Sequence, residues 1–581
     1  MTQEQHSLLD LDGGEHTAPP PVPRRRTEAA TGKPPGRFEG LRRNRRWLFA
    51  LVVFALLAEM AVAMVTAAVE QTPTIDEPVY VATGAVYVQQ HNLRYNPEHP
   101  PLGKLIIATG PAFAHPHLDA AFVGNQTALG RHLLYESGND PWRLMLLARL
   151  PVIVLTLLFG LVVLAFARDL AGPVGGLVAL ALYAFSPDII AHGSLATLDV
   201  PAAGFLLTSV WLLWRARRRP PLYLPLVGVA LGAAVATKMS ALPAVPVLLL
   251  LVVMSVWYAR RTHDSGRWRT ARLLALGVAA AVVVALVAVA VVWATYLAVD
   301  PRLRWATPEN LPVTPGLRGL AVDWLPLPEP YRDGMLIQFG FENSTFGGFL
   351  LGRYYHGSLW YYLPAALLIK TPLGMLALWS AGVVAIVTLP RLRPAAPYVL
   401  MPPAVLLAAA LNGSRDFGVR YAVFVPMFLA VAAAGVVAFR WRWGPVLTAA
   451  LVLFITVSSL WTYPYYLPYS NEAFGGPSKT YLRLHDSNVD WGQDLGRLAD
   501  RIRQRYPDEK IWLVYKGSGV PSFYGIDASD PRTVPPSEVH GLLVVSDSSI
   551  AKADGRLAAL IESSRPIDEV GHSITIYRRG P

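Results

Sequence analysis

The chain has 581 residues, of which 53% are hydrophobic and only 16% are charged. This is more apolar surface than one soluble core can bury, so we expect an integral membrane protein. The formal net charge is +11, but most Lys and Arg residues flank apolar segments, where orientation in a bilayer explains them and a nucleic-acid partner is not needed. The absence of Cys excludes disulfides, thiolate zinc sites and cysteine nucleophiles.

The first segment, residues 1–46, is polar and rich in Pro and Arg and has no apolar periodicity. It is predicted to be a disordered cytoplasmic N-terminus. The apolar run that follows, residues 47–69, is long enough to cross a bilayer and lacks a convincing cleavage pattern. We therefore interpret it as an uncleaved first span.

Eleven segments have the length and apolar character of membrane spans, taking about 20 residues for one crossing. They are residues 47–69, 144–167, 173–190, 200–215, 221–237, 240–258, 272–297, 372–389, 395–411, 421–438 and 444–462. With a cytoplasmic N-terminus, the basic clusters between these spans all fall on the cytoplasmic side. The sequence thus predicts an all-α polytopic protein of the plasma membrane, with residues 47–462 as its transmembrane domain.

Three longer segments fall on the outer side in this topology: loops 70–143 and 298–371, and the tail 463–581. Pro78 and Pro101 are each placed to begin a short helix along the membrane surface. The tail is predicted to be a small extracytoplasmic α/β domain, because residues 491–503 have helical spacing. Its expected strands are residues 511–515, 542–546 and 573–577.

Two adjacent acids, Asp76 and Glu77, directly follow the first span. Acids at a helix start accept free backbone N–H groups and interact favourably with the helix dipole, so capping is one explanation. The other is chemical: adjacent carboxylates at a membrane surface provide a base for one hydroxyl and a hydrogen-bonding partner for its carrier. The pair by itself does not decide between them.

Two ionisable residues lie at the outer ends of predicted spans. Asp199 begins the fourth span, and a charge entering a membrane helix requires a partner. Lys238 lies in a very short outer turn, against the trend that places basic residues inside. Its alternative explanation is a side chain that extends to the interface without a specific role.

Further cations are expected at the outer surface, namely Lys104, Lys370, Arg415 and Arg420. Several bases at the bilayer edge suit a phosphate anchored in lipid, because a partly dehydrated phosphate needs charge-assisted donors. Each of them alone is also explained as surface charge. His192 and His356 are candidate metal ligands, but isolated histidines are more often structural, so no required metal or other cofactor is predicted.

Several common motifs are missing from the sequence. It contains no Walker loop, no HExxH zinc helix and no dinucleotide fingerprint. The nucleophile elbow Gly-x-Ser-x-Gly is absent as well, although residues 516–519 come close to it. ATP-driven transport and the common hydrolase mechanisms are therefore disfavoured.

The order of several short motifs resembles a known superfamily. They are the pair Asp76–Glu77, the run Asn96-Pro97-Glu98-His99-Pro100-Pro101-Leu102-Gly103-Lys104, Asp199 at the head of the fourth span, and the stretches 232–238, 361–372, 420–426 and 486–494. Together they resemble the glycosyltransferases of the GT-C fold that use lipid-phosphate sugars, including protein O-mannosyltransferases and aminoarabinose transferases. The resemblance covers nearly the whole chain.

The resemblance implies that a sugar, mannose or a related hexose or pentose, moves from a polyprenyl-phosphate carrier to an acceptor on the outer face of the membrane, with inversion. It implies that Asp76 is the general base and that Glu77 orients acceptor or donor hydroxyls. Lys104, Lys238, Lys370 and Arg420 become candidates for holding the lipid phosphate, together with Asp199 as a binding residue.

The acceptor and the class of activity leave alternatives open. The chain lacks the large β-rich insertion that eukaryotic mannosyltransferases carry in the second outer loop, so a protein, a lipid and a cell-wall glycan are all candidate acceptors. A flippase of lipid-linked sugars would share the spans and the basic surface but would need no base, and it would predict more polar residues in mid-membrane. A non-catalytic scaffold would place its important residues in the tail.

Overall fold

The computed structural model describes residues 37–260, 267–314 and 316–580. The chain forms two units, Met1–Leu51 and Val52–Pro581, and the second contains all of the elements discussed below except the beginning of the first helix. This helix, α1, spans Arg37–Glu70 and begins earlier than residue 47, where the sequence predicted it to start. The prediction of disorder for residues 1–36 lies outside the described residues.

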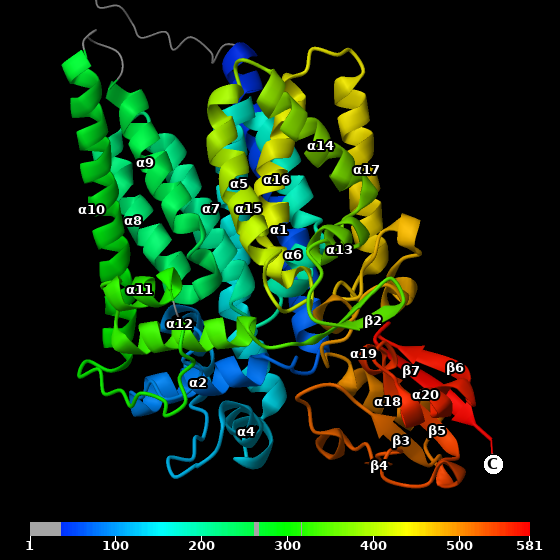
Figure 1. Cartoon of the computed structure of the whole chain (residues 1–581). Helices are drawn as coiled ribbons and strands as arrows, with labels where there is room; N and C mark the ends of the chain where they lie inside the picture. Colours follow the sequence, from blue (N-terminus) through cyan, green and yellow to red (C-terminus); the bar gives the residue numbers. More distant parts are fainter. Residues whose placement is uncertain (1–36, 261–266, 315, 581) are drawn as a thin grey trace, which may run out of the picture. The chain divides into compact units, whose positions relative to one another are not determined.

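The second unit consists mainly of a helical bundle (Figure 1). Besides α1, its long helices are α5 (Pro141–Ala184), α7 (Asp199–Ala216), α8 (Pro220–Thr237), α9 (Ala244–Arg260), α10 (Arg267–Val299), α14 (Leu373–Thr388), α15 (Ala396–Ala410), α16 (Phe424–Ala433) and α17 (Gly444–Thr462). These helices coincide with the apolar segments that the sequence indicated, since an apolar chain satisfies its backbone hydrogen bonds internally as a helix.

One predicted segment is interrupted. Residues 173–190 were expected to form one span, but the helix ends at Ala184 and a short helix, α6 (Pro187–Gly193), follows. Within α5, Gly172 has a φ of 78° and precedes Pro173, whose missing N–H breaks the helical hydrogen-bond ladder. The second and third predicted segments are therefore separated by a kink at Gly172.

Among the described residues, five helices are long and apolar enough to cross a membrane. They are Asn44–Glu70, Pro141–Ala184, Pro220–Thr237, Thr270–Val299 and Gly444–Thr462, and α13 (Tyr362–Lys370) with α14 forms a sixth candidate that is bent by 117°. The helices Ala244–Arg260 and Phe424–Ala438 are apolar but shorter. The total of eleven spans stays a prediction.

Shorter elements lie at the lower end of the bundle in Figure 1, where α2 and α12 run across it. They are α2 (Glu77–Gln90), α3 (Pro101–Ala108), α4 (Gln126–Arg131), α11 (Leu317–Trp324), α12 (Glu329–Glu342) and the hairpin of β1 (Gly347–Leu350) with β2 (Arg353–His356). The predicted helix starts at Pro78 and Pro101 are confirmed, because both prolines occupy the first turn of a helix.

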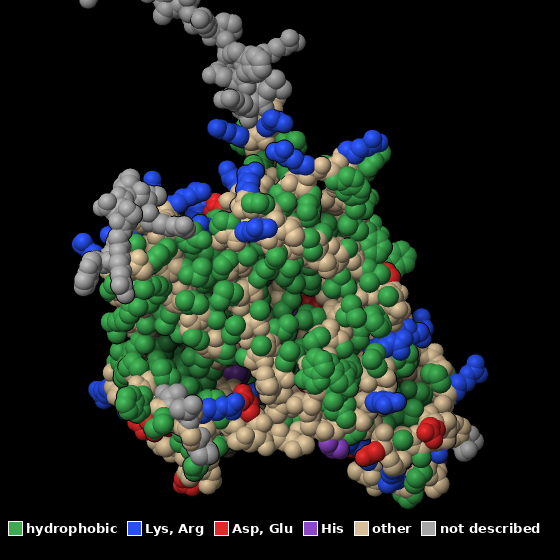
Figure 2. Space-filling view, turned by 45° about the horizontal axis from the view of Figure 1, so that its top comes forward, with side chains coloured by type: hydrophobic (Ala, Val, Ile, Leu, Met, Phe, Trp, Pro, Cys, Tyr) green, Lys and Arg blue, Asp and Glu red, His purple; other side chains and the backbone are tan. Residues whose placement is uncertain are grey.

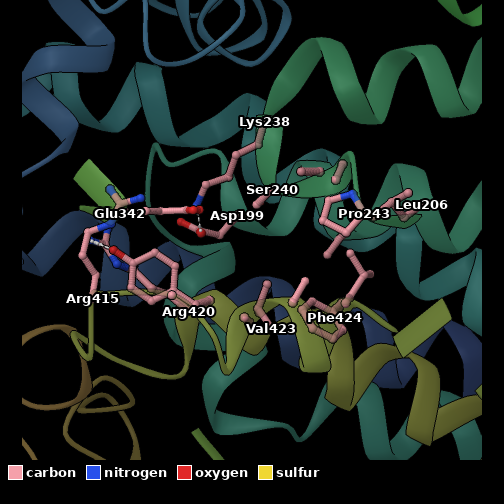
Figure 3. Close-up of a pocket in the computed structure, with 18 of the residues that line it drawn as sticks. Asp199, Leu206, Lys238, Ser240, Pro243, Glu342, Arg415, Arg420, Val423 and Phe424 are labelled. Atoms are coloured by element: carbon pink, nitrogen blue, oxygen red, sulfur yellow. Dashed lines mark hydrogen bonds and ion pairs between the residues drawn. The ribbon is translucent and has the colours of Figure 1, made fainter. Parts of the chain in front are cut away.

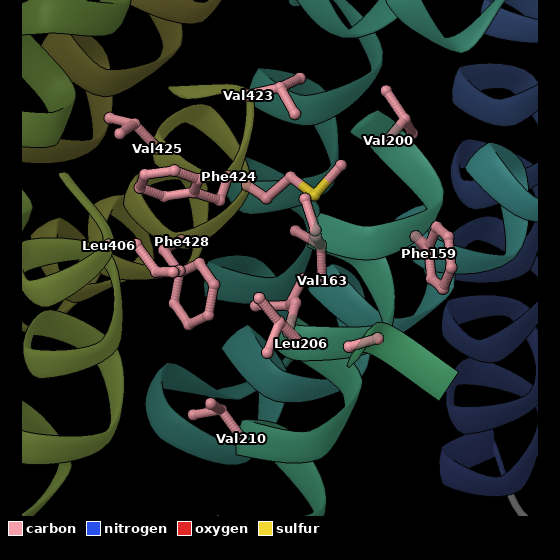
Figure 4. Close-up of a cluster of buried hydrophobic side chains, with 14 of the residues drawn as sticks. Phe159, Val163, Val200, Leu206, Val210, Leu406, Val423, Phe424, Val425 and Phe428 are labelled. Carbon is pink, nitrogen blue, oxygen red and sulfur yellow. The ribbon is translucent and has the colours of Figure 1, made fainter. Parts of the chain in front are cut away.

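Close helix packing holds the bundle together. Gly228 and Gly232 of α8 face α10, where an added Cβ would come within 2.7 Å of Val287 and Val291, so these glycines permit the two backbones to approach. A buried apolar cluster joins α5, α7, α15 and α16, with Phe159, Leu206 and Phe428 among its members (Figure 4).

The surface of the bundle agrees with its predicted environment. Hydrophobic side chains cover most of the face seen in Figure 2. The α7–α8, α14–α15 and α16–α17 junctions, which carry the basic residues Arg217–Arg219, Arg391, Arg393, Arg440 and Arg442, lie at the same, upper end in Figure 1. A common end is what the predicted orientation requires. The orientation itself and the cytoplasmic N-terminus stay predictions.

The tail contains a five-stranded sheet of order β4-β3-β5-β7-β6. Its elements are α18 (Leu495–Arg505), β3 (Ile511–Val514), β4 (Ala528–Ser529), β5 (Gly541–Ser546), α19 (Asp547–Ile550), α20 (Gly555–Glu562), β6 (Arg565–Val570) and β7 (Ile574–Arg579). The strands β3, β4 and β5 are parallel, and β7 is antiparallel to β5 and β6.

Alternating side chains of the sheet face opposite layers. Leu542 and Val544 pack with α18, whereas Leu543 and Val545 pack with α20, as the period of two along a strand dictates. The predicted helix and the three predicted strands of the tail are confirmed, while β4 and β6 were not predicted. β4 is only two residues long, and β6 has exposed side chains at three of its six positions.

Candidate functional site

A cavity of about 170 Å³ lies at the ends of α7, α8 and α15 and beside the segment that leads into α16. Its lining has two parts (Figure 3). Polar and charged side chains occupy one end, namely Asp199, Lys238, Ser240, Glu342, Ser414, Arg415, Arg420 and Tyr421. The other end is apolar and includes Leu206, Pro243, Leu406, Val423 and Phe424.

Asp199 and Lys238 form a buried ion pair in this cavity. Asp199 is the first residue of α7 and Lys238 is the residue that directly follows α8. Lys238 Nζ donates a hydrogen bond to Asp199 Oδ1 at 2.5 Å. α7 and α8 are joined by a short turn and pack antiparallel, which brings the start of one next to the end of the other. Each residue therefore supplies the partner that the other requires.

Arg420 connects the cavity to Asp76. Arg420 Nη1 donates to Asp76 Oδ2 at 2.5 Å, and its guanidinium lies 4.3 Å from the centroid of the Trp491 ring. The Asp76 side chain remains 27% exposed. Although Asp76 is the residue before α2, its side chain accepts no capping hydrogen bond. Capping of α2 by a hydrogen bond to Asp76 is therefore wrong, and the Asp76 carboxylate instead pairs with Arg420 at the cationic end of the site.

The cations of the cavity surround one aromatic ring. The charged groups of Lys238, Arg415 and Arg420 lie 5.4, 5.9 and 5.1 Å from the centroid of the Tyr421 ring. The negative face of an aromatic ring attracts cations, which helps to hold three like charges close together. Arg415 is also fixed by Gln338, whose Oε1 accepts a hydrogen bond at 2.9 Å.

The tail positions the segment that carries Arg420. Val419 N donates to Asn488 Oδ1 at 3.0 Å, and Ser487 Oγ donates to the Phe417 carbonyl at 2.8 Å. Gly418 has a φ of 151°, and an added Cβ would lie 2.3 Å from Ser487 Oγ, so only glycine fits this close approach. The motif 486–494 thus contributes to the site by holding the bundle loop in place.

Glu77 lies in a different environment from its neighbour Asp76. It is fully buried and forms a bidentate pair with Arg149, with N–O distances of 2.8 and 2.6 Å. Its oxygens also accept from the backbone N–H groups of Thr74 and Ala196. Burial raises the pKa of Glu77, but Arg149 and these hydrogen bonds outweigh burial and hold it below the usual value. Its role of orienting substrate hydroxyls stays a prediction, and its contacts favour a role in positioning.

Lys104 is also enclosed by protein groups. Its Nζ donates to the Asn96 carbonyl at 2.7 Å, to Asn96 Oδ1 at 3.2 Å and to the His99 carbonyl at 2.6 Å. The side chain is fully buried, and burial lowers the pKa of Lys104 to about 7, against the opposing effect of Glu98. Lys104 is not among the residues that line the cavity, and it organises the loop between α2 and α3.

Lys370 connects the bundle to the tail. Its Nζ donates to the carbonyls of Leu467 and Asn488 at 2.5 and 3.0 Å and lies 3.5 Å from Asp188 Oδ1. The side chain is 1% exposed and does not line the cavity. Of the four cations considered for the lipid phosphate, Lys238 and Arg420 meet in the cavity, and Lys104 and Lys370 lie elsewhere.

Two residues of this region were missed by the sequence reasoning. Arg149 lies inside the predicted span 144–167, where a lone charge is costly and marks a buried partner; that signal was present in the sequence. Glu342, the last residue of α12, lines the cavity but has no distinguishing sequence context. Its position depends on how the segment 298–371 folds over the bundle.

The candidate metal ligands do not come together. His192 is buried beside Trp491, with ring centroids 6.2 Å apart, whereas His356 lies on the β1–β2 hairpin next to Tyr354. Within residues 37–260, 267–314 and 316–580, no three His, Asp or Glu side chains form a group that could hold a metal ion. The independence from metals stays a prediction.

Residues 52–300 match the family model described as dolichyl-phosphate-mannose-protein mannosyltransferase. No curated protein matches the chain. Among solved structures, the chain is similar to ArnT from Cupriavidus metallidurans in the apo state, with 16% identity, a TM-score of 0.45, and coverage of 93% of this chain and 100% of that one.

ArnT from the same organism bound to undecaprenyl phosphate has 16% identity and a TM-score of 0.42, with coverage of 91% of this chain and 99% of that one. The protein O-mannosyltransferase Pmt1–Pmt2 complex of S. cerevisiae, bound to the sugar donor, has 19% identity and a TM-score of 0.34, with coverage of 44% of this chain and 33% of that one.

The matched residues 52–300 include Asp76, Glu77, Lys104, Asp199 and Lys238, whereas Lys370 and Arg420 lie beyond them. The resemblance to mannosyltransferases that the order of motifs predicted is therefore confirmed, and it is carried by the N-terminal half of the bundle.

Proposed function

We propose that this protein is an integral membrane glycosyltransferase that moves a sugar from a polyprenyl-phosphate carrier to an acceptor on the outer face of the plasma membrane. The observation that carries the proposal is the two-part cavity beside Asp76. It joins a cationic end to an apolar end, and an ionisable carboxylate stands next to its cations.

The cavity suits a ligand with an anionic head and an apolar chain. Lys238, Arg415 and Arg420 converge on the polar end, and charge-assisted hydrogen bonds from such groups are the ones that bind phosphate strongly. The apolar end shares Leu206 and Phe424 with the core of the bundle (Figures 3 and 4). An isoprenoid chain bound there would bury its apolar surface away from water, which is favourable.

In this proposal Asp76 is the general base. It takes the proton of the acceptor hydroxyl while the new glycosidic bond forms at the sugar, and the carrier phosphate leaves with the electrons of the broken bond. Arg420 and Lys238 stabilise the negative charge that grows on that phosphate. The ion pair between Arg420 and Asp76 must loosen as substrate enters, because both groups then have other partners.

In this proposal Glu77 is a positioning residue for Asp76. Its pair with Arg149 fixes the turn 72–76 that leads to Asp76, since Arg149 also donates to the carbonyls of Gln71 and Thr72. Lys104 and Lys370 likewise fix the loop and the tail segment around the site. The domain limits 47–462 and 463–581 and the outer location of the tail belong to the same proposal.

Sugar transfer by the purified protein tests the proposal. Wild type, Asp76→Asn and the matched control Asp323→Asn, an exposed acid of α11, are solubilised in detergent and supplied with radiolabelled polyprenyl-phosphate sugars and a membrane extract. Mannose is the first donor to test because the matched family model is a mannosyltransferase. The chemical class of the labelled product distinguishes a protein, lipid or glycan acceptor.

We expect label to move with wild type and the control and not with Asp76→Asn. Equal transfer by Asp76→Asn contradicts the assignment of the base. A folded wild type that uses none of the donors contradicts the glycosyltransferase proposal and favours a flippase of lipid-linked sugars or a scaffold.

A further inference from the structure

A second cleft lies in the tail, at the ends of two parallel strands. It is lined by Val514, Lys516, Arg532, Ser548, Ser549, Lys552, Asp554, Arg556 and Leu557 and has a volume of about 440 Å³. Lys516 follows the end of β3 and Ser548 follows the end of β5. Because ligands of open α/β sheets bind in the crevice outside the carboxyl ends of the parallel strands, this is where the topology places a ligand.

The cleft is strongly cationic. Four Lys or Arg side chains line it against the single acid Asp554. Lys516 pairs with Asp486, and Arg532 pairs with Asp530. Among the described residues, Lys552 and Arg556 have no carboxylate within ion-pair distance. The cleft therefore has positive charge that the folded chain does not neutralise.

Arg556 has two N–H donors that no acceptor satisfies among the described residues. Its Nη1 donates to the Arg532 carbonyl at 3.1 Å. Its Nε and Nη2 are buried and have no hydrogen-bond partner among the described residues. A buried donor without an acceptor is destabilising, and a guanidinium presents two parallel N–H groups that match an oxyanion.

The surroundings of Lys552 are also positively charged. Burial lowers the pKa of Lys552, and the charge of Lys516 lowers it further against the opposing effect of Asp486. An anion between the two lysines would relieve their repulsion. Ser549, which is half-buried in the same wall, adds a hydroxyl that can donate to an oxyanion.

We propose that this cleft is a binding site for a phosphate group, separate from the transfer cavity, with Lys552 and Arg556 as its principal ligands. The phosphate comes either from a soluble phosphate ester or from the headgroup of an anionic lipid. The cleft adjoins the segment that carries Arg420, because the ammonium of Lys552 lies 5.8 Å from the centroid of the Phe417 ring. Phosphate binding is thus placed next to the transfer site.

Phosphate binding to the full chain tests this inference. The protein is placed in nanodiscs of neutral phosphatidylcholine, and the affinity for inorganic phosphate and for glucose 6-phosphate is measured by calorimetry, with glucose as the neutral control. Wild type is compared with Lys552→Ala/Arg556→Ala, with Lys552→Gln as a milder variant, and with Lys510→Ala, an exposed lysine of the same domain outside the cleft. Size-exclusion profiles verify that each variant is folded.

We expect the double variant to weaken phosphate binding at least about tenfold, and Lys552→Gln to weaken it less, because each removes charge-assisted contacts. Lys510→Ala should bind as wild type does. The transfer cavity is also cationic, so Lys238→Met is measured in parallel. Phosphate binding to the proposed cleft is the part of the measured binding that Lys238→Met retains and the double variant loses.

A second set of nanodiscs, containing phosphatidylglycerol, distinguishes the two sources. Loss of inorganic phosphate binding in these discs identifies the lipid headgroup as the ligand, and unchanged binding identifies a soluble phosphate. Unchanged phosphate affinity in the folded double variant, or no binding by wild type in neutral discs, overturns the proposal. Neither result depends on sugar transfer, so failure of the transferase proposal is observed separately.

Discussion

The adjacent acids Asp76 and Glu77 belong to two different regions of the molecule. We call the surroundings of Asp76, Lys238 and Arg420 the cavity region and the surroundings of Glu77 and Arg149 the fastening region. Asp76 belongs to the cavity region, where its half-buried carboxylate faces Arg420 and remains accessible. Glu77 belongs to the fastening region, where Arg149 and two backbone N–H groups occupy its oxygens. All of the partners of Glu77 in the structure are protein groups, which favours a role in positioning. Exposure and remaining hydrogen-bonding capacity therefore separate the two regions better than residue type.

The largest expected effect distinguishes the two acids by activity. Asp76→Asn should lower the turnover of sugar transfer by about 10²–10⁴-fold, the range for loss of a general base, and should leave the melting temperature close to that of wild type. The measurement is turnover at saturating donor, with thermal unfolding of the same sample. A melting temperature that falls together with the turnover would place Asp76 in the fastening region instead.

Arg149→Met tests the fastening region through stability. It leaves the Glu77 carboxylate buried without its partner, which should lower the free energy of unfolding by about 3–5 kcal/mol. Thermal unfolding in detergent measures the loss as a lower melting temperature. Glu77→Gln/Arg149→Met removes both charges and should be less destabilised than the sum of the single variants. Strict additivity would show that the pair is not coupled.

Lys238→Met and Lys370→Met compare two buried lysines of the two regions. Lys238→Met should raise the KM for the donor by about tenfold or more, because a charge-assisted contact to the donor is lost. Lys370→Met should leave that KM unchanged and lower the melting temperature, since Lys370 contacts only protein groups. Initial rates over a range of donor concentrations provide the values. A higher donor KM in both variants would reassign Lys370 to the donor site.

The smallest expected effect is the pH dependence that Lys104 confers. The pKa of Lys104 is lowered from 10.5 to about 7 in the folded protein, so between these values the unfolded chain binds more protons. Stability should therefore rise with pH from about 7 to about 10, with a slope of at most about 1.4 kcal/mol per pH unit. Lys104→Met should lack this slope in thermal unfolding measured at pH 7, 8 and 9. Parallel curves for wild type and Lys104→Met would contradict the shifted pKa.

The transmembrane part could largely be predicted from the sequence. An apolar segment of about 20 residues has one way to satisfy its backbone in lipid, so hydropathy locates the helices. The break at Phe185 and Ser186 was not foreseen, although Ser186, Pro187 and Asp188 form a sequence signal for the start of a new helix. In the tail, the three strands that consist of short β-prone runs were predicted, and the partly exposed β6 was not, because it lacks such a run.

The sequence by itself determined that several acids and bases lie at the ends of the predicted spans, because their positions follow from where the apolar segments begin and end. Only the tertiary structure decided which of them remain available, since that depends on contacts between residues far apart in the chain. Asp76 meets Arg420, Glu77 meets Arg149, and Lys370 meets the tail carbonyls. These long-range partners decide whether a charged side chain pairs within the fold or remains available to a ligand. No local sequence pattern identifies them.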